Sequence, residues 1–451
     1  MGELAMILSS AAPAARSTDR FGASWEGRRV LVIGLGRSGS AAARWLHQVH
    51  AHVCITEARD TEATRQAAQE LRALGIEDIE LGAHSRALVD GADAVIVSPG
   101  VPESAEPIHW IVERGVPLLS EVELAFRFCP SPIVAITGTN GKSTAVMLLA
   151  DVLRAAGRPA IACGNVGIPF CHVLPQLTSE TVAVVEVSSF QLMGCETFRP
   201  KVGVLLNIGT NHLDRHRDPA AYLEAKARLF QRQTPEDWAV LNGADPHLVA
   251  LGESLRAQRV WFGDNRSNSS AFILAPQTQR ALAPGAQAVL QAARILGVAD
   301  PLAWQVMRAF RGLEHRMEFV GTVHGVQYVN DSKSTTPDSL LFALKRTPGP
   351  VVVILGGRDK GMDFHSVITP LHDARVKGIV LIGESRARIR PLLNGSTIVH
   401  ECGSLAEAVR TAGTLAEPGT TVLFSPACAS FDMFKNFEER GRAFKRVVQQ
   451  L

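Results

Sequence analysis

The stretch Ile133-Val-Ala-Ile-Thr-Gly138-Thr-Asn-Gly141-Lys142-Ser143-Thr144 decides the fold of this 451-residue chain. A buried apolar run comes first, a glycine-rich turn follows, and a helical pattern begins at Ala145. Glycines let backbone N–H groups turn inward around phosphate oxygens, and the next helix adds a positive dipole. Lys142 has the reach for the β- and γ-phosphates of ATP, and Ser143 or Thr144 offers a hydroxyl to Mg²⁺. The pattern predicts an ATP site. The alternative is an incidental glycine-rich turn, since the loop is shorter than GxxxxGK[ST].

Strands and helices alternate on both sides of this stretch. Apolar runs that read as strands lie at 29–34, 52–56, 92–98, 181–185, 202–206, 327–330, 351–355, 378–382 and 421–424. Strands separated by helices at this spacing form βαβ units and parallel sheets. We therefore expect an α/β protein with three units in series, divided near residues 128 and 312. A flexible extension at 1–28 precedes them.

Composition excludes several classes of protein. Lys and Arg number 46 against 44 Asp and Glu, so the net charge of +2 gives no reason to expect nucleic acid as a partner. The seven cysteines contain no CxxC pair, which fits a reducing cytoplasm better than a disulfide framework. The apolar patch at 5–15 is too short to span a membrane and lacks a basic start, so a signal peptide is the minor alternative. We expect a cytoplasmic protein without membrane insertion.

A second glycine-rich turn, Gly34-Leu35-Gly36-Arg37-Ser38-Gly39, follows the first strand, and Glu57 ends the next one. This pairing suits a diphosphate at a helix N-terminus and a carboxylate that binds ribose hydroxyls. NAD, FAD and a UDP-sugar all meet these requirements. The pattern alone leaves the three open.

Three further residues have a functional and an ordinary interpretation. Glu186 ends an apolar strand, where a Mg²⁺ ligand is expected beside a phosphate loop, but it also fits a solvated strand end. His212 is a candidate metal ligand, although a hydrogen-bonded loop histidine is the more common case. Lys226 lies in the helical pattern 220–231, where a lysine is ordinarily exposed.

Polar loops follow three strands late in the chain, at 330–335, 356–361 and 425–437. In a parallel sheet these loops share one edge, where ligands bind. We expect Lys333, Lys360 and Ser430 to converge there on an anion such as a carboxylate. Cys428 stands between alanines without a nearby histidine, so packing explains it better than nucleophilic chemistry.

Together, these motifs resemble the Mur ligase family, from about residue 28 to the end. The similarity rests on GLGRSG, VSPGV, ITGTNGKST, GNVGIP, EVSSFQL, NHLDRH, YLEAKARLF, GLEHRMEF, NDSKSTT, GGRDKG and SPACASFDMFKNFEERG. The last motif is typical of members that add D-glutamate, and the DNPR motif of the diaminopimelate-adding members is absent. The resemblance implies a UDP-binding Rossmann-like domain at 29–128, a P-loop ATPase-type domain at 129–312 and a Rossmann-like domain at 313–451.

The resemblance also implies a reaction in peptidoglycan synthesis, and with it a role in cell shape and division. ATP phosphorylates the alanyl carboxylate of UDP-N-acetylmuramoyl-L-alanine, and the amine of D-glutamate attacks the acyl phosphate. Two Mg²⁺ ions and a carbamate formed from CO₂ on Lys226 are the implied cofactors, and we expect a monomer. The implied catalytic residues are Lys142, His212, Lys226 and Lys333. The implied metal ligands are Ser143, Glu186, His212 and carbamylated Lys226.

Binding residues carry over from the same motifs. Those for ATP are Gly138, Thr139, Asn140, Gly141, Lys142, Ser143, Thr144, Arg316 and Asp331. Those for the UDP-sugar substrate are Leu35, Arg37, Ser38, Glu57, Arg59, Ser98, Gly100, Asn165 and Gln191. Those for D-glutamate are Thr335, Lys360, Ser430 and Phe437.

The sequence departs from the family pattern at three places. Glu57 replaces a frequent Asp, and Asn211 replaces the Asp that usually precedes the motif histidine. The segment 262–293 is short and lacks the His-Asn pair whose helix contacts adenine, leaving Gln291 as the nearest amide. Two other classes stay open: a binding homologue without catalysis, and a nicotinamide-dependent oxidoreductase suggested by GLGRSG alone. A folylpolyglutamate synthetase-like ligase shares the central loop but usually lacks the first domain.

Overall fold

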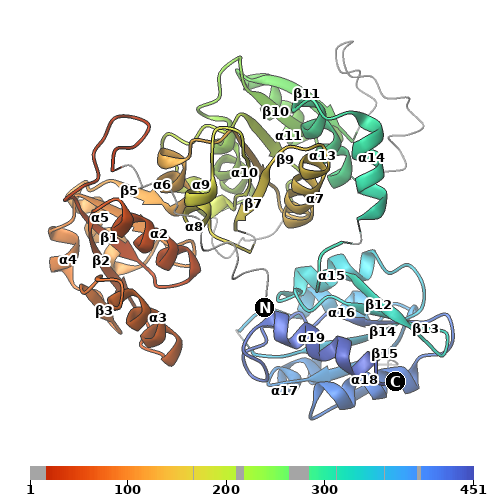
Figure 1. Ribbon diagram of the computed structural model, residues 1–451. Helices are drawn as coiled ribbons and strands as arrows, with labels where there is room; N and C mark the ends of the chain where they lie inside the picture. Colours follow the sequence, from red (N-terminus) through yellow and green to blue (C-terminus); the bar gives the residue numbers. More distant parts are fainter. Residues whose placement is uncertain are drawn as a thin grey trace. The chain divides into compact units, whose positions relative to one another are not determined.

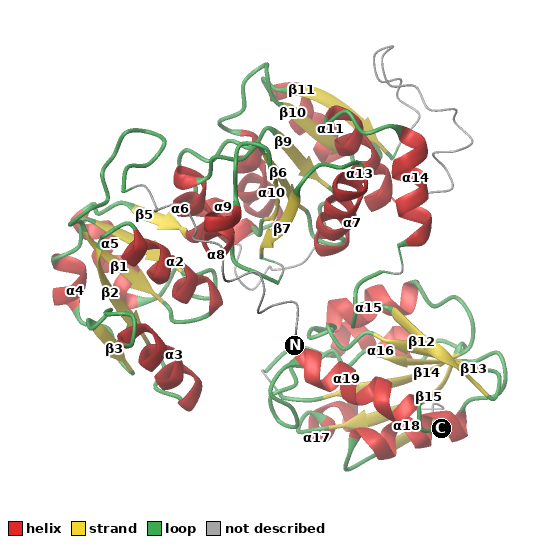
Figure 2. Ribbon diagram, viewed as in Figure 1, coloured by secondary structure: helices red, strands yellow, loops and turns green. Residues whose placement is uncertain are grey.

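The protein is a three-domain α/β molecule, as the sequence predicts (Figure 1). The computed structural model describes residues 17–165, 167–209, 218–263, 284–310, 312–359, 361–393 and 398–451. Contacts along the chain divide it into two compact units. The first unit ends at Phe310 and contains two sheets, and the second contains one. Helices flank each sheet (Figure 2).

The first sheet is parallel and has the strand order β3-β2-β1-β4-β5. The predicted strands at 29–34, 52–56 and 92–98 are β1, β2 and β4. Its strands are β1 (Arg29–Ile33), β2 (His52–Glu57), β3 (Ile79–Leu81), β4 (Ala94–Val97) and β5 (Leu118–Ser120). Its helices are α2 (Arg37–Gln48), α3 (Glu62–Arg72), α4 (Arg86–Asp90), α5 (Glu106–Arg114) and α6 (Glu121–Phe128).

The second sheet is also parallel and runs β11-β10-β9-β6-β8-β7. Its strands are β6 (Ile133–Thr137), β7 (Ala160–Gly164), β8 (Val182–Glu186), β9 (Val202–Leu205), β10 (Trp238–Asn242) and β11 (Gln258–Phe262). Its helices are α7 (Lys142–Ala155), α8 (Phe170–Val173), α9 (Ser189–Met193), α10 (Pro219–Ala227), α11 (Pro246–Ser254), α13 (Pro284–Ile295) and α14 (Asp300–Ala309). The strand β6 lies between β8 and β9, so the loops after these three strands are neighbours.

The third sheet has the order β12-β13-β17-β14-β15-β16 and is parallel except for the edge strand β12. Its strands are β12 (Glu318–Val323), β13 (Val326–Asn330), β14 (Val351–Gly356), β15 (Val376–Ile382), β16 (Val399–Glu401) and β17 (Thr421–Phe424). Its helices are α15 (Pro337–Lys345), α16 (His365–Leu371), α17 (Arg386–Ile389), α18 (Leu405–Leu415) and α19 (Phe437–Val448).

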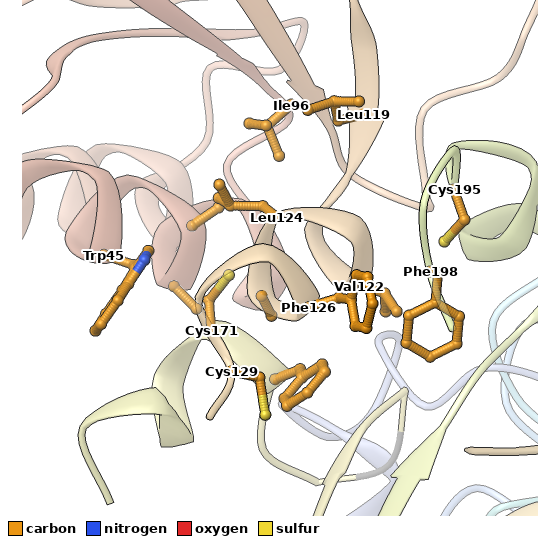
Figure 3. Packing of buried hydrophobic residues seen from close by; sticks show 14 of the residues in the cluster. Trp45, Ile96, Leu119, Val122, Leu124, Phe126, Cys129, Cys171, Cys195 and Phe198 are labelled. Carbon is orange, nitrogen blue, oxygen red and sulfur yellow. The ribbon is translucent and has the colours of Figure 1, made fainter. Parts of the chain in front are cut away.

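Alternation along the central strands builds a core on each face of each sheet. In β14, Val353 faces the helices α15 and α16, whereas Val352 and Ile354 face α18 and α19. Both faces are covered, which is why these strands read as continuous apolar runs. In the first unit, one core extends from the first sheet into the second, and Figure 3 shows Phe126 and Phe198 within it. Their ring centroids are 5.4 Å apart in an edge-on contact.

The expected flexible extension at 1–28 is wrong for residues 17–28, because these residues pack against the first domain. Asp19 is buried; its Oδ1 accepts the N–H groups of Phe21 and Ala23, and its Oδ2 accepts the indole N–H of Trp25 at 3.0 Å. The buried Trp25 ring lies edge-on to Phe128, with 5.9 Å between centroids. Residues 1–16 lie outside the described part of the chain.

A buried carboxylate fastens the first domain to the second. Glu123 of α6 is fully buried and accepts the backbone N–H groups of Glu196, Thr197 and Phe198 at 3.0–3.2 Å. Its Oε1 also accepts Nε of Arg127, one helical turn later, at 3.0 Å. A buried charge needs this number of donors to offset its loss of hydration.

Among the described residues, we find no helix with the length and apolar character needed to cross a membrane.

We predict that Glu123→Gln lowers the free energy of unfolding by about 3 kcal/mol, since it breaks a buried ionic network. Urea denaturation of the full chain measures this. Glu70→Gln is the matched control, because Glu70 makes an exposed pair with Arg44 that contributes under about 1 kcal/mol. An equal loss in the two variants would contradict the role given to Glu123.

Candidate active site

The loop after β6 adopts a backbone that requires glycine at two positions. Gly138 has φ 152° and Gly141 has φ 85°, both in the region that favours glycine. A Cβ on Gly138 would lie 3.0 Å from Cβ of Leu206. The helix α7 begins directly after Gly141 with no side-chain cap. First-turn N–H groups of a helix have no acceptor within it, so the start of α7 is suited to an anion.

Asn207, which follows β9, holds this loop, and the sequence reasoning missed it. Its Oδ1 accepts the N–H groups of Thr139 at 3.1 Å and Asn140 at 2.9 Å, and its Nδ2 donates to the Asn140 carbonyl at 3.1 Å. The N–H of Gly209 donates to Oγ1 of Thr139 at 2.8 Å. The signal was available: an amide side chain follows the strand next to β6, at the same edge of the sheet.

Lys142 lies over the loop as the motif predicts. Its Nζ donates to the carbonyls of Gly138 at 2.8 Å and Thr139 at 3.0 Å. These contacts place an ammonium group beside the turn where phosphates would bind.

Of the three predicted metal ligands that the structure describes, Ser143 and Glu186 are in direct contact. Ser143 Oγ donates to Oε2 of Glu186 at 2.5 Å, and Nδ2 of Asn165 donates to Oε1 of Glu186 at 3.0 Å. Both Ser143 and Glu186 are buried. Glu186 is therefore not the solvated strand end that was the alternative interpretation. Its carboxylate and the Ser143 hydroxyl are hard oxygen donors of the kind that Mg²⁺ prefers.

Lys226 of α10 points into the same site, and its ordinary interpretation as an exposed lysine is wrong. The side chain is 1% exposed. Its Nζ donates to the Gly138 carbonyl at 3.1 Å and lies 4.5 Å from the ring centroid of Tyr222. Burial lowers the pKa of Lys226 well below its usual value; the charge of Lys142 lowers this pKa further, and Glu186 offsets part of the effect. The site therefore contains a buried amine with a reduced proton affinity.

A cleft of about 740 Å³ in the first unit gathers most of the predicted UDP-substrate residues. It extends from the first glycine-rich turn to residues that follow β7. The predicted residues that line it are Arg37, Ser38, Glu57, Arg59, Ser98, Gly100 and Asn165. The helix α2 starts at Arg37 without a side-chain cap, which suits a diphosphate.

Leu35 and Gln191 do not line this cleft. Gln191 lines an adjoining cavity of about 520 Å³ that also touches Ser98. Its Oε1 accepts the N–H of Ser188 at 3.0 Å, which caps α9. The N–H of Leu35 donates to Oε2 of Glu57 at 2.8 Å.

Glu57 organises the glycine-rich turn. Besides Leu35, the backbone N–H and the guanidinium of Arg59 both donate to its Oε1, at 3.0 and 3.2 Å. Burial alone would raise the pKa of Glu57, but the hydrogen bonds from Leu35 and Arg59 outweigh burial and hold it below its ordinary value. An ionised carboxylate thus fixes the turn from inside the cleft.

In the third domain, five of the predicted side chains lie at the loops after β13 and β17 or at the start of α19: Asp331, Lys333, Thr335, Ser430 and Phe437. Asp331 accepts Oγ of Ser425 at 2.9 Å and the N–H of Met317 at 3.2 Å. Burial raises the pKa of Asp331 to about 6, against the effect of these donors and of the Arg316 charge. Nζ of Lys333 lies 3.9 Å from the ring centroid of Phe437.

Ser430 is buried, and Thr335 is half-buried beside the same edge. Cys428 is buried as expected: burial raises the pKa of its thiol to about 11, and Sγ donates to Oγ of Ser385 at 3.4 Å. It is no candidate nucleophile.

His212, Asn211 and Lys360 lie outside the described residues, so the predicted convergence of Lys360 with Lys333 and Ser430 stays a prediction. Gln291 is buried and accepts Nη1 of Arg294 at 3.3 Å.

Comparison with known families decides the family. Three models match: the MurD-like N-terminal domain of Mur ligases over 28–120, the Mur ligase middle domain over 136–283, and the Mur ligase glutamate ligase domain over 315–428. The chain belongs to the Mur ligase family. It is 38% identical to a protein of Desulfosudis oleivorans named UDP-N-acetylmuramoylalanine--D-glutamate ligase, over 94% of this chain and 97% of that one. A protein of the same name from Pelotomaculum thermopropionicum is 39% identical, over 94% and 98%.

Solved structures of other Mur ligases have the same fold. MurC from Thermotoga maritima, a UDP-N-acetylmuramate-alanine ligase, matches 94% of this chain and 99% of its own with a TM-score of 0.57 at 18% identity. The MurF ligase of the same organism, in complex with ADP, matches 94% and 96% with a TM-score of 0.57 at 17% identity. These similarities support the three-domain α/β architecture.

The depressed pKa of Lys226 predicts a pH-dependent stability. Between its folded pKa and the usual 10.5, the unfolded chain binds a proton that the folded chain does not, so this group makes stability rise with pH. In CO₂-free buffer, we compare the free energy of unfolding of the native chain with that of Lys226→Met. The native value minus the variant value should increase as the pH rises from about 7 to 9. Denaturant titrations at each pH measure the difference. Parallel curves would show that Lys226 keeps its ordinary pKa.

Proposed function

We propose that this Mur ligase is an ATP-dependent enzyme that joins D-glutamate to UDP-N-acetylmuramoyl-L-alanine in peptidoglycan precursor synthesis, and through it serves cell shape and division. The observation that carries the proposal is the group of half-buried Lys142 with buried Ser143, Glu186 and Lys226 around the Gly138 turn. The names of relatives at 38–39% identity over 94% of the chain support the choice of substrates. If the chain were a nicotinamide-dependent oxidoreductase, the loop at 138–143 and the residues around it would have no explanation.

ATP would bind with its phosphates at the start of α7. The α7 dipole and Lys142 then stabilise the negative charge that moves as the γ-phosphoryl group is transferred to the alanyl carboxylate. Phosphate is a far better leaving group than hydroxide, so the chain's main task is to position and neutralise anions. Ser143 and Glu186 would hold Mg²⁺, which when bound neutralises phosphate charge; His212 and a carbamate on Lys226 are the other proposed ligands.

Lys226 is suited to carbamate formation. The neutral amine attacks the carbon of CO₂: an N–C bond forms as one C=O π bond opens to C–O⁻, and one amine proton passes to solvent, giving a carboxylate on an extended side chain. The reaction needs a deprotonated amine, which burial beside Lys142 provides. The new negative charge would form near the cation Lys142, whose charge acts on Lys226.

The UDP-sugar would occupy the 740 Å³ cleft, with its diphosphate at the start of α2. Arg37 and Arg59 are cations at its wall, and Glu57 keeps the turn in shape. Leu35, Ser38, Ser98, Gly100, Asn165 and Gln191 complete the proposed set.

In the third domain, Thr335, Lys360, Ser430 and Phe437 form the proposed D-glutamate pocket. Arg316, Asp331 and Lys333 are assigned to ATP and the acyl phosphate. We assign the domains the limits 29–128, 129–312 and 313–451, and we propose a cytoplasmic monomer.

Phosphate release tests the proposed reaction. With ATP, Mg²⁺ and UDP-N-acetylmuramoyl-L-alanine, we expect release with D-glutamate but not with L-glutamate, L-lysine or diaminopimelate. Lys142→Ala should lower the rate at least about 100-fold, since it removes charge stabilisation from the transferred group. Arg154→Gln, which changes an exposed ion pair on the same helix, is the control. Binding of the UDP-sugar without release for any amino acid would favour the non-catalytic homologue.

Carbonate isotopes test the carbamate. After incubation with ¹³C-bicarbonate, we expect one carbamate carbon resonance in the native chain and none in Lys226→Met. Activity should fall in CO₂-depleted buffer and return on addition of bicarbonate. Lys201→Met, at an exposed lysine, should leave the resonance unchanged. Full activity without CO₂ would contradict the proposed role of the carbamate while leaving the ligase assignment intact.

A further inference from the structure

Three potential metal ligands meet at the edge of the first sheet opposite to the cleft. His52 opens β2 and Cys54 follows two residues later, so their side chains are on the same face of the strand. Asp78 directly precedes β3, and the backbone N–H of Ile55 donates to its carbonyl at 2.8 Å. Because Ile55 pairs with Ile79 across the parallel strands β2 and β3, Asp78 lies beside Cys54.

This register brings the three side chains close together. His52 Nε2 lies 3.0 Å from Asp78 Oδ2, and Sγ of Cys54 lies 3.6 Å from the same oxygen. All three ligand atoms lie within 4.8 Å of one another. His52 and Asp78 are exposed, whereas Cys54 is buried beneath them. Among the described residues, it is the one group of three His, Cys, Asp or Glu side chains whose ligand atoms lie this close together.

We propose that His52, Cys54 and Asp78 bind a transition-metal ion of the Zn²⁺ type, with water as the fourth ligand. Zinc takes imidazole nitrogen, thiolate sulfur and carboxylate oxygen at bond lengths that separate tetrahedral ligand atoms by about 3.3–3.8 Å. The observed 3.0 and 3.6 Å need only small side-chain adjustments to reach this range. The thiolate excludes Mg²⁺ and Ca²⁺, which prefer oxygen.

Binding would exchange a proton for the metal. The Cys54 S–H bond breaks, an S–Zn bond forms, and the proton passes to solvent, while neutral His52 and ionised Asp78 each donate an electron pair. The two anionic ligands balance the charge of the divalent ion. Arg29, whose Nη2 lies 4.0 Å from Asp78 Oδ2, is the competing cation. The bound ion would link β2 to β3 at their amino ends, away from Glu57 at the other end of β2.

Cobalt spectroscopy on the full, tag-free chain tests the site, because Co²⁺ replaces Zn²⁺ and a cobalt–thiolate bond gives a near-ultraviolet absorption band. We expect one equivalent of Co²⁺ to produce the band, and excess Zn²⁺ or a chelator to remove it. Cys54→Ser should abolish the band. His52→Ala, at an exposed side chain that the fold tolerates, should weaken Co²⁺ binding by more than about tenfold, since even outer-shell changes cost that much.

Two matched variants complete the test. Cys402→Ser changes another buried cysteine, and His47→Ala changes a histidine of the same domain; both should keep the band and its affinity. Cobalt bound at the proposed Mg²⁺ ligands gives no thiolate band, so the two sites are distinguishable. Absence of the band in the native chain, or its persistence in Cys54→Ser, would overturn the proposal. So would equal Co²⁺ affinity in His52→Ala and the native chain.

Discussion

The carboxylate of Glu123 holds the cleft together, because it belongs to the first domain and accepts backbone N–H groups of the second. The backbone N–H groups of residues 196–198 surround it, and Arg127 neutralises it from its own helix. The apolar contact of Phe126 with Phe198 lies one turn away. The 740 Å³ cleft is lined from both domains, so its shape depends on this junction. A charge with several backbone donors gives a directional attachment that apolar packing alone does not provide.

Charge balance around the Gly138 turn explains why one lysine can be buried there. Lys142 and Lys226 both donate to the Gly138 carbonyl, and the charge of Glu186 acts on Lys226. Burial is the main cause that weakens the hold of Lys226 on its proton; the charge of Lys142 adds to this effect, and Glu186 offsets part of it. The same environment that destabilises the ammonium form favours addition of CO₂. The carbamate would add a second negative charge to that of Glu186, and this excess of negative charge favours a divalent ion.

Much of the fold follows from local patterns, but several side-chain roles do not. The runs that became β1, β6 and β14 are apolar because both faces of their sheets are covered, and the glycine-rich turns follow them. The burial of Lys226 was not predictable from α10, since its helical pattern does not show which neighbour covers it. The order of residues 17–28 depends on the Trp25–Asp19 contact, whose partners are too dispersed to form a recognisable motif. The role of Asn207 was not predictable because its partner Asn140, in the loop that it holds, lies 67 residues away in the sequence.

Glu57 lies where its motif predicts, but its carboxylate makes other contacts than the motif suggests. Sequence spacing placed a carboxylate at the end of β2, and the structure has it in the cleft wall. Its oxygens, however, accept N–H groups from Leu35 and Arg59, so the carboxylate fixes the glycine-rich turn that borders the cleft. The extra methylene of Glu relative to Asp suits this role, because the side chain must cross from β2 to the loop after β1. The proposed contact with ribose would therefore compete with loop organisation for the same two oxygens, and the lowered pKa of Glu57 follows from the donors already in place.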